Sequence, residues 1–328
     1  MGELKIAIIG CGAIVLNNHL PAIIKSSDLK ITAFIDRDKE TAKYLADKYG
    51  AVYGAEIKSV PKETEAVLIA VPNSIHANLA IECLESGYHV LSEKPMATEL
   101  SDCQKLIKAV SKNQLVYAIV HQLRYETSIA FMKKQMEAMQ QKIDFIDLAY
   151  GAKFSWSSRT GFYSDEKLAG GGVLIDLGCH LLDLAEYLVG PIESVTMTAA
   201  FEQDLSSKMD TACAIDLAFE NGVKGRCRVS RLKLLENRVQ IGNGSGYMES
   251  YFGKPEIKYA FKSALVDHGG AVDLTLDWID PFESLWCAFY DKIHGIKNGL
   301  SLADEDTGLS NMKLISKLYD SSTRILSV

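Results

Sequence analysis

The most constraining feature of this sequence is the strand-and-turn pattern near its beginning. The run Leu4–Ile9 is short, apolar and rich in isoleucine, and Gly10 and Gly12 follow it. This pattern is typical of a buried strand that turns sharply into a helix. Gly10 would allow the tight turn, and Gly12 would let the backbone approach a pyrophosphate at the helix N-terminus. The sequence therefore predicts the first half of a dinucleotide-binding unit, although Val15 stands where the third glycine of G-x-G-x-x-G is expected.

A glycine pair alone is weak evidence, because ordinary strand-to-helix turns also contain it. The next apolar run, Lys30–Ile35, ends at Asp36. A carboxylate at this strand end can accept hydrogen bonds from both hydroxyls of an adenosine ribose. Arg37 follows directly, and its guanidinium could also hold a 2′-phosphate. We therefore expect NAD as the cofactor and keep NADP as the alternative.

Composition excludes several classes of function. The chain has 328 residues, which is enough for two domains, and its net charge of −7 argues against nucleic acid or an anionic membrane as a partner. Its seven cysteines include no C-x-x-C pair, so we expect neither a metal site nor a disulfide framework. Unpaired thiols, the lack of a signal-peptide pattern and the lack of an apolar run near ~20 residues together predict a cytoplasmic protein.

Strands and helices alternate through about residue 122, which predicts an α/β, doubly wound parallel sheet of the Rossmann type as domain 1–122. Pro21 falls inside the first expected helix, so that helix is predicted to kink or end near Asn18. After Asp36 the expected helices cover 38–48, 75–86 and 98–112, and the expected strands cover 52–53, 66–70, 88–91 and 115–118.

The rhythm changes after residue 122, and domain 123–328 is predicted to be an α+β domain on a largely antiparallel sheet. Short turns such as Glu220-Asn221-Gly222 join consecutive β-like runs, which is typical of antiparallel strands. The expected strands are 143–156, 192–202, 210–219, 223–230, 237–243 and 246–252, and the expected helices are 127–141, 172–188, 281–297 and 303–323.

Two predicted strand ends in the first domain carry unusual residues. Val71-Pro72-Asn73 follows one strand and Glu93-Lys94-Pro95 follows the next. Ligands of open α/β sheets bind beyond the carboxyl ends of the strands. Proline disfavours helical backbone at Lys94, so this side chain is expected to extend toward the cofactor crevice. The ordinary alternative is a solvated surface lysine.

A third segment begins with the triple glycine 170–172 and continues as a helical stripe of leucines. Asp176, His180 and Asp183 share a neighbouring face of that helix. Ionisable groups beside leucines would be costly in a core unless they line a cleft or pair with each other. A single histidine is more often structural, and a metal site here would lack an evident further ligand.

Taken in this order, the motifs resemble those of the family of glucose-fructose oxidoreductase and inositol dehydrogenase (Gfo/Idh/MocA). The motifs are Gly10-Cys11-Gly12, Asp36, Glu93-Lys94-Pro95, and Gly170-Gly171-Gly172 followed by Asp176, Gly178 and His180. The resemblance spans nearly the whole chain, and it implies an NAD(P)-dependent oxidoreductase with catalytic residues Lys94, Asp176 and His180. It also implies a homodimer or homotetramer.

The motifs and the resemblance together give the expected binding residues. For the cofactor these are Gly10, Cys11, Gly12, Ala13, Ile14, Asp36, Arg37, Val71, Pro72, Asn73, His76, Glu93, Lys94 and Gln122. The substrate, a small polyol or sugar, is expected to contact Lys94, Arg124, Arg159, Tyr163, Asp176 and His180.

Oxidation of a secondary alcohol needs a base for the hydroxyl proton. An imidazole, with an ordinary pKa near ~6.5, suits that transfer at neutral pH. We therefore expect His180 to be the general acid/base, Asp176 to orient it, and Lys94 to stabilise the developing alkoxide. Lys94 is the alternative proton carrier, and Tyr163 is a further candidate base.

The leading hypothesis is an NAD(P)-dependent oxidoreductase that acts on a hydroxyl or keto group of a sugar, cyclitol or sugar nucleotide. The alternatives are a non-catalytic NAD(P) redox sensor and an NAD-dependent glycosidase that uses transient oxidation. Assembly is expected through the C-terminal sheet, because runs such as Val195-Thr196-Met197, Ala214-Ile215-Asp216 and Val239-Gln240-Ile241 place apolar groups on alternating sides.

Overall fold

The computed structural model describes residues 2–138, 142–153, 161–202, 204–261, 271–297 and 299–327. The chain forms two compact units. The first comprises Met1–His121, Ser157–Gly170 and Phe282–Met312, and the second comprises Gln122–Trp156, Gly171–Pro281 and Lys313–Val328. The first unit thus contains segments from both sides of residue 122, and the second contains only residues from 122 onward.

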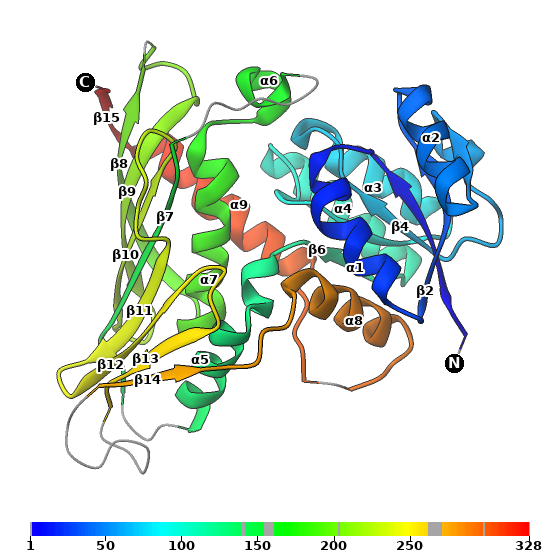
Figure 1. The fold of residues 1–328 in the computed structure, drawn as a ribbon. Helices are drawn as coiled ribbons and strands as arrows, with labels where there is room; N and C mark the ends of the chain where they lie inside the picture. The colour runs from blue at the N-terminus through cyan, green and yellow to red at the C-terminus, as the bar shows by residue number, and fades with distance from the viewer. Residues whose placement is uncertain are drawn as a thin grey trace. The chain divides into compact units, whose positions relative to one another are not determined.

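The first unit is built on a six-stranded parallel sheet with strand order β3-β2-β1-β4-β5-β6. Figure 1 shows strands of this sheet with helices packed beside them. The strand order reverses at β1 and β4, as in a doubly wound fold, so the predicted fold class is confirmed for this unit. The strands are β1 (Leu4–Ile9), β2 (Leu29–Ile35), β3 (Val52–Gly54), β4 (Ala66–Ile69), β5 (His89–Ser92) and β6 (Tyr117–Ile119). Every residue of β4 is buried, as expected for a parallel strand covered on both faces.

The helices of this unit follow the local sequence signals. For example, Asp38 caps α2 (Lys39–Tyr49) by accepting a hydrogen bond from the Thr41 amide, and Gly50 ends it in left-handed conformation. The other helices are α1 (Leu20–Lys25), α3 (His76–Glu85), α4 (Leu100–Asn113), the short α6 (Glu166–Ala169), α8 (Pro281–Ile293) and the first part of α9 (Glu305–Ser321).

The first helix does not end near Asn18, but its regular geometry is interrupted there. A π-turn spans Val15–His19, and regular α-helix continues from Leu20 to Lys25. Pro21 lies in the first turn of α1. The carbonyl that a residue with an N–H would bond from this position, that of Asn17, falls inside the π-turn. The π-turn begins at Val15, the position where the third glycine of the motif was expected.

The second unit is built on a nine-stranded sheet with order β14-β13-β12-β11-β7-β10-β9-β8-β15. Its pairs are antiparallel except for β7 with β10 and β8 with β15, which confirms the predicted largely antiparallel sheet. The strands are β7 (Phe145–Gly151), β8 (Ile192–Phe201), β9 (Asp210–Phe219), β10 (Lys224–Ser230), β11 (Arg238–Asn243), β12 (Gly246–Tyr251), β13 (Glu256–Tyr259), β14 (Val272–Thr275) and β15 (Thr323–Leu326). The last three were not predicted.

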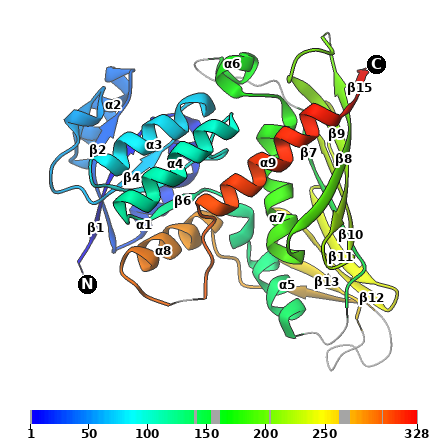
Figure 2. The same cartoon turned by 180° about the vertical axis from the view of Figure 1, so that it is seen from behind.

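Helices α5 (Thr127–Ala138) and α7 (Cys179–Val189) lie along one face of this sheet (Figure 2). The helical stretch Glu166–Val189 is long and apolar enough to cross a membrane, but 83% of its most apolar window is buried inside the structure. Such burial is typical of a core helix in a globular protein.

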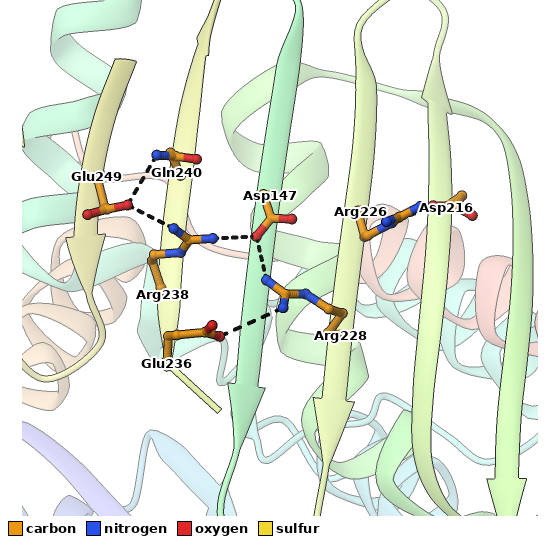
Figure 3. A network of polar contacts seen from close by, with 8 residues as sticks. All are labelled: Asp147, Asp216, Arg226, Arg228, Glu236, Arg238, Gln240 and Glu249. Atoms are coloured by element: carbon orange, nitrogen blue, oxygen red, sulfur yellow. Dashed lines mark hydrogen bonds and ion pairs between the residues drawn. The ribbon is translucent and has the colours of Figure 1, made fainter. Parts of the chain in front are cut away.

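The opposite face of the sheet carries a ladder of charged side chains (Figure 3). Asp147 on β7 accepts hydrogen bonds from Arg228 on β10 and Arg238 on β11, at 2.8 and 2.9 Å. Arg238 also reaches Glu249 on β12. The runs predicted to support assembly turn their large apolar residues to the other face. Val195, Met197, Ile215, Val239 and Ile241 are at most 5% exposed, because the strand alternation turns them toward the helix-covered core.

Candidate active site

The predicted cofactor residues of the first unit gather at one edge of its parallel sheet. The glycine loop follows β1, Asp36 follows β2, Val71 follows β4 and Lys94 follows β5. All these strands are parallel, so their carboxyl ends meet at the same edge. Gln122, after β6, falls in the second unit.

The glycine loop has the form that a dinucleotide requires. Gly10 has a φ of 93°, and a Cβ there would lie 2.0 Å from the Ala70 carbonyl oxygen, so only glycine fits. At Gly12, by contrast, a Cβ would meet no atom within 4 Å. The backbone of Gly12 therefore has open space beside it, which fits the approach of a pyrophosphate. Ala13 and Ile14 continue the loop with exposed side chains.

The Asp36 carboxylate holds the glycine loop. Its Oδ2 accepts a hydrogen bond of 2.7 Å from the Cys11 amide, and its Oδ1 accepts one of 2.8 Å from the Asp38 amide. Each carboxylate oxygen has two lone pairs, so both can still accept from ribose hydroxyls. Arg37 beside it is exposed.

Glu93, directly before Lys94, belongs to a buried polar chain. Trp286 Nε1 donates to His19 Nδ1 at 3.2 Å, and His19 Nε2 lies 2.9 Å from Glu93 Oε1. Indole N–H is only a donor, so His19 carries its proton on Nε2 and donates to Glu93. Burial raises the pKa of Glu93, but this hydrogen bond and the nearby positive groups outweigh it and lower the pKa below its usual value. Glu93 Oε2 accepts from the amide of the half-buried Lys94 at 3.2 Å.

His76 contacts the main chain of the two segments that follow β4 and β5. Its Nδ1 is 2.8 Å from the Pro95 carbonyl oxygen, and its Nε2 is 2.7 Å from the Val71 carbonyl oxygen. Burial lowers the pKa of this histidine, and a neutral imidazole can donate to only one of the two carbonyls. The ring therefore bridges the segments after β4 and β5. Its role as a cofactor contact stays a prediction, as does that of Asn73, whose amide donates to the Ala169 carbonyl at 2.8 Å.

The second unit presents Asp176 and His180 on one continuous helical segment. A π-turn spans Leu174–Gly178, and α7 follows it directly. Asp176 lies in the first turn and is 8% exposed, and His180 is 4% exposed. Both are buried titratable groups on the segment that follows the triple glycine. Lys94 is in the first unit, so its predicted meeting with Asp176 and His180 stays a prediction.

The predicted substrate residues lie in different settings. Arg124 forms a two-pronged ion pair with Asp183, with Nε to Oδ2 at 2.8 Å and Nη2 to Oδ1 at 2.6 Å, and both residues are buried. Any substrate contact by Arg124 would have to use its remaining N–H groups. Tyr163, in the turn Phe162–Ser164, is half-buried beside the Phe162 ring. Arg159 lies outside the described residues.

Sequence reasoning missed three buried residues around these motifs. Trp286 completes the His19–Glu93 chain, while Asp210 and Tyr319 contact the triple-glycine segment. Their partners are more than 30 positions away along the chain, so no local spacing could have revealed them. Within the described part of the chain, no group of three or more His, Cys, Asp or Glu side chains could hold a metal ion.

Comparison with known proteins gives two family matches that cover both units in part. Residues 4–121 match the oxidoreductase family with an NAD-binding Rossmann fold, GFO_IDH_MocA. Residues 142–245 match the GFO/IDH/MocA C-terminal domain.

Among curated relatives, D-glucoside 3-dehydrogenase of Escherichia coli is 29% identical over 196 residues, which are 57% of this chain and 54% of that enzyme. The match thus spans about half the length of that relative. Levoglucosan dehydrogenase of Pseudarthrobacter phenanthrenivorans is 31% identical, over 68% of this chain and 65% of that enzyme.

A solved 3-ketoreductase from Actinomadura kijaniata, in complex with NADP and TDP-benzene, has the same fold over 100% of both chains, with a TM-score of 0.86 at 17% identity.

Proposed function

Because this chain belongs to the GFO/IDH/MocA oxidoreductase family, we propose that it is an NAD(P)-dependent oxidoreductase acting on a secondary hydroxyl or keto group of a sugar, cyclitol or sugar nucleotide. The observation that carries the proposal is the shared strand edge, where the glycine loop, Asp36 and Lys94 come together. Curated relatives that act on glucosides and levoglucosan support the substrate class.

The residues at this edge fit a dinucleotide. Gly10 and Gly12 would receive the pyrophosphate, the helix after them would contribute free N–H groups, and Asp36 would accept from the ribose. The nicotinamide, when bound, supplies the hydride acceptor or donor.

The protein's own residues would transfer the hydroxyl proton and stabilise the negative charge on the substrate oxygen. His180 would take the hydroxyl proton during oxidation and return it during reduction. Asp176 would orient the imidazole, and Lys94 would donate a hydrogen bond to the oxygen on which negative charge develops.

The test has two stages. First, cyclitols, aldoses and nucleotide sugars are screened with NAD and NADP for a change in reduced-nicotinamide absorbance, and turnover with at least one of them is expected. Bound cofactor without any turnover would contradict the proposal.

Second, His180→Ala should lower kcat by roughly 10² to 10⁴ while leaving cofactor affinity nearly unchanged, because the imidazole acts on the proton and not on the dinucleotide. His180→Asn serves as the control, since it keeps a polar side chain of similar size but cannot titrate. A His180→Ala variant with full kcat would overturn the assignment.

A further inference from the structure

Two residues far away in the sequence leave no room for a side chain at the second and third glycines of the triple glycine. A Cβ on Gly171 would lie 2.4 Å from the Tyr319 hydroxyl oxygen, and a Cβ on Gly172 would lie 2.0 Å from the Asp210 carbonyl oxygen. Both distances are much shorter than a real contact, and the second involves main chain that cannot move aside. The segment is therefore packed directly against the first residue of β9 and the last turns of α9.

The same two residues hold this segment with hydrogen bonds. Tyr319 donates its hydroxyl proton to Asp210 Oδ1 at 2.7 Å. It also accepts from the Gly172 amide at 3.2 Å, an amide that it shares with the Lys208 carbonyl at 2.8 Å. Asp210 Oδ2 accepts from the Leu174 amide at 3.0 Å. Asp210 is fully buried and Tyr319 is 4% exposed, so water does not compete for these bonds.

Each bond acts where the helix begins. Leu174 is the first residue of the π-turn, and its amide is one of those that a helix leaves unsatisfied at its N-terminus. Asp210, which belongs to β9, therefore caps this helix although it is distant from it in the sequence. The Asp176 amide in turn donates to the Gly172 carbonyl at 3.2 Å. The anchored residues Gly172 and Leu174 thus flank the start of the segment that carries Asp176 and, one turn later, His180.

We propose that Tyr319 and Asp210 are a positioning pair that sets the placement of Asp176 and His180 for proton transfer. The inference rests on the proposed function of His180. Proton transfer needs heavy atoms about 2.6 to 3.2 Å apart, and a displacement of about 1 Å can lower a rate by about 10²-fold. Loss of the Tyr319 hydroxyl removes its two hydrogen bonds, to Asp210 and from Gly172, and leaves the Leu174 and Lys208 bonds to hold the segment, so the helix start can shift.

The test compares Tyr319→Phe with Tyr290→Phe. Tyr290 is also buried and donates its hydroxyl to a main-chain carbonyl, that of Gly2 at 3.1 Å, but it lies in the first unit. Tyr319→Phe should lower kcat on the alcohol found in the screen by roughly tenfold or more, with KM and the NADH dissociation constant within about twofold of the unmodified protein. Tyr290→Phe should leave all three unchanged.

A second measurement needs no turnover. Hydrogen exchange of the ligand-free protein should become faster at residues 172–180 in Tyr319→Phe and not in Tyr290→Phe. Asp210→Asn keeps an acceptor for the Leu174 amide, so it should lose less activity than Asp210→Ala.

Two results would overturn the inference: a Tyr319→Phe variant with unchanged kcat, or one in which NADH affinity falls as much as kcat. If His180→Ala lowers kcat and Tyr319→Phe does not, only the positioning role fails. If His180→Ala itself is fully active, the proposed function of the site fails.

Discussion

The Asp36 carboxylate supports the glycine loop through the Cys11 amide and also lies at the strand end where a ribose would bind. A negative charge at this place repels a 2′-phosphate while it accepts from ribose hydroxyls. We therefore predict that the protein binds NADH more tightly than NADPH, as fluorescence titration would measure. Asp36→Ala should reduce that preference, and it should also weaken both cofactors because the Cys11 amide loses its acceptor.

The control for this prediction is Asp36→Asn, which keeps one acceptor oxygen and removes the charge. It should reduce the preference while weakening NADPH binding less than Asp36→Ala does. Tenfold tighter binding of NADPH to the unmodified protein, or ~1.4 kcal/mol, would show that the exposed Arg37 decides the choice.

Lys94 and His180 are predicted to act on the same substrate oxygen, one as a donor to it and the other on its proton. Lys94→Ala should lower kcat by roughly 10²-fold, and the double variant should lose less than the product of the two single effects, because residues that act as a unit are not additive. Lys105→Ala, which changes an exposed lysine on α4, is the control and should combine additively with His180→Ala. If the effects of Lys94→Ala and His180→Ala on kcat are fully additive, the two residues do not act as a unit and this prediction is wrong.

The residue before helix α5 is a buried glutamate, and burial disfavours its charged form. Glu126 is 4% exposed and accepts a hydrogen bond of 3.1 Å from the Gly253 amide. Burial raises its pKa from 4.5 to about 7, with the Gly253 bond opposing the rise. The folded protein therefore holds this proton more tightly than the unfolded chain, and stability should fall as the pH rises from about 4.5 to about 7.

Glu126→Gln keeps an acceptor for the Gly253 amide and cannot ionise. We predict that it raises the free energy of unfolding above about pH 8 by up to roughly 3 kcal/mol, and that the gain disappears toward about pH 4. Urea unfolding at several pH values measures this. Glu137→Gln, at an exposed position of the same helix, is the control. A gain independent of pH would exclude ionisation of Glu126 as the cause.

At the scale of elements, the sequence predicted what depends on local pattern. The alternation of the first 120 residues and the strands from 192 to 252 follow from period, turn residues and caps, and the structure has them within a few residues. The short strands β13, β14 and β15 form by hydrogen bonding to a neighbouring strand. The local sequence pattern does not indicate such a pairing. For the same reason, the packing of Phe282–Met312 with the first unit was not predicted.

The candidate site shows the same limit. The placement of Asp36 and Lys94 at strand ends was predicted, because parallel topology fixes which ends meet. Glu93 is bonded by His19, which is bonded in turn by Trp286, and the glycine turn is bonded by Tyr319. Only the folded chain brings these residues together.

At the scale of the whole molecule, the sheet of the second unit gives a new reason to expect assembly. The sequence suggested assembly through apolar side chains, whereas the structure points to charged ones. Its face opposite α5 and α7 combines Arg226, Arg228 and Arg238 with Asp147 and with the carboxylates of further strands (Figure 3). Positive and negative groups alternate across this face, so a second copy turned by 180° can place each sign against the other. Small side chains such as Ala214 let the two faces approach.

We therefore predict that light scattering gives a mass of at least twice 36.1 kDa at micromolar concentration. Ala214→Arg should shift the mass toward that of one chain, because Ala214 is exposed on β9 and a long cation there blocks close approach without disturbing the core. Ala138→Arg, at an exposed position of α5, should leave the mass unchanged. A single-chain mass for the unmodified protein would refute assembly, and an Ala214→Arg variant that keeps the larger mass would place the interface elsewhere.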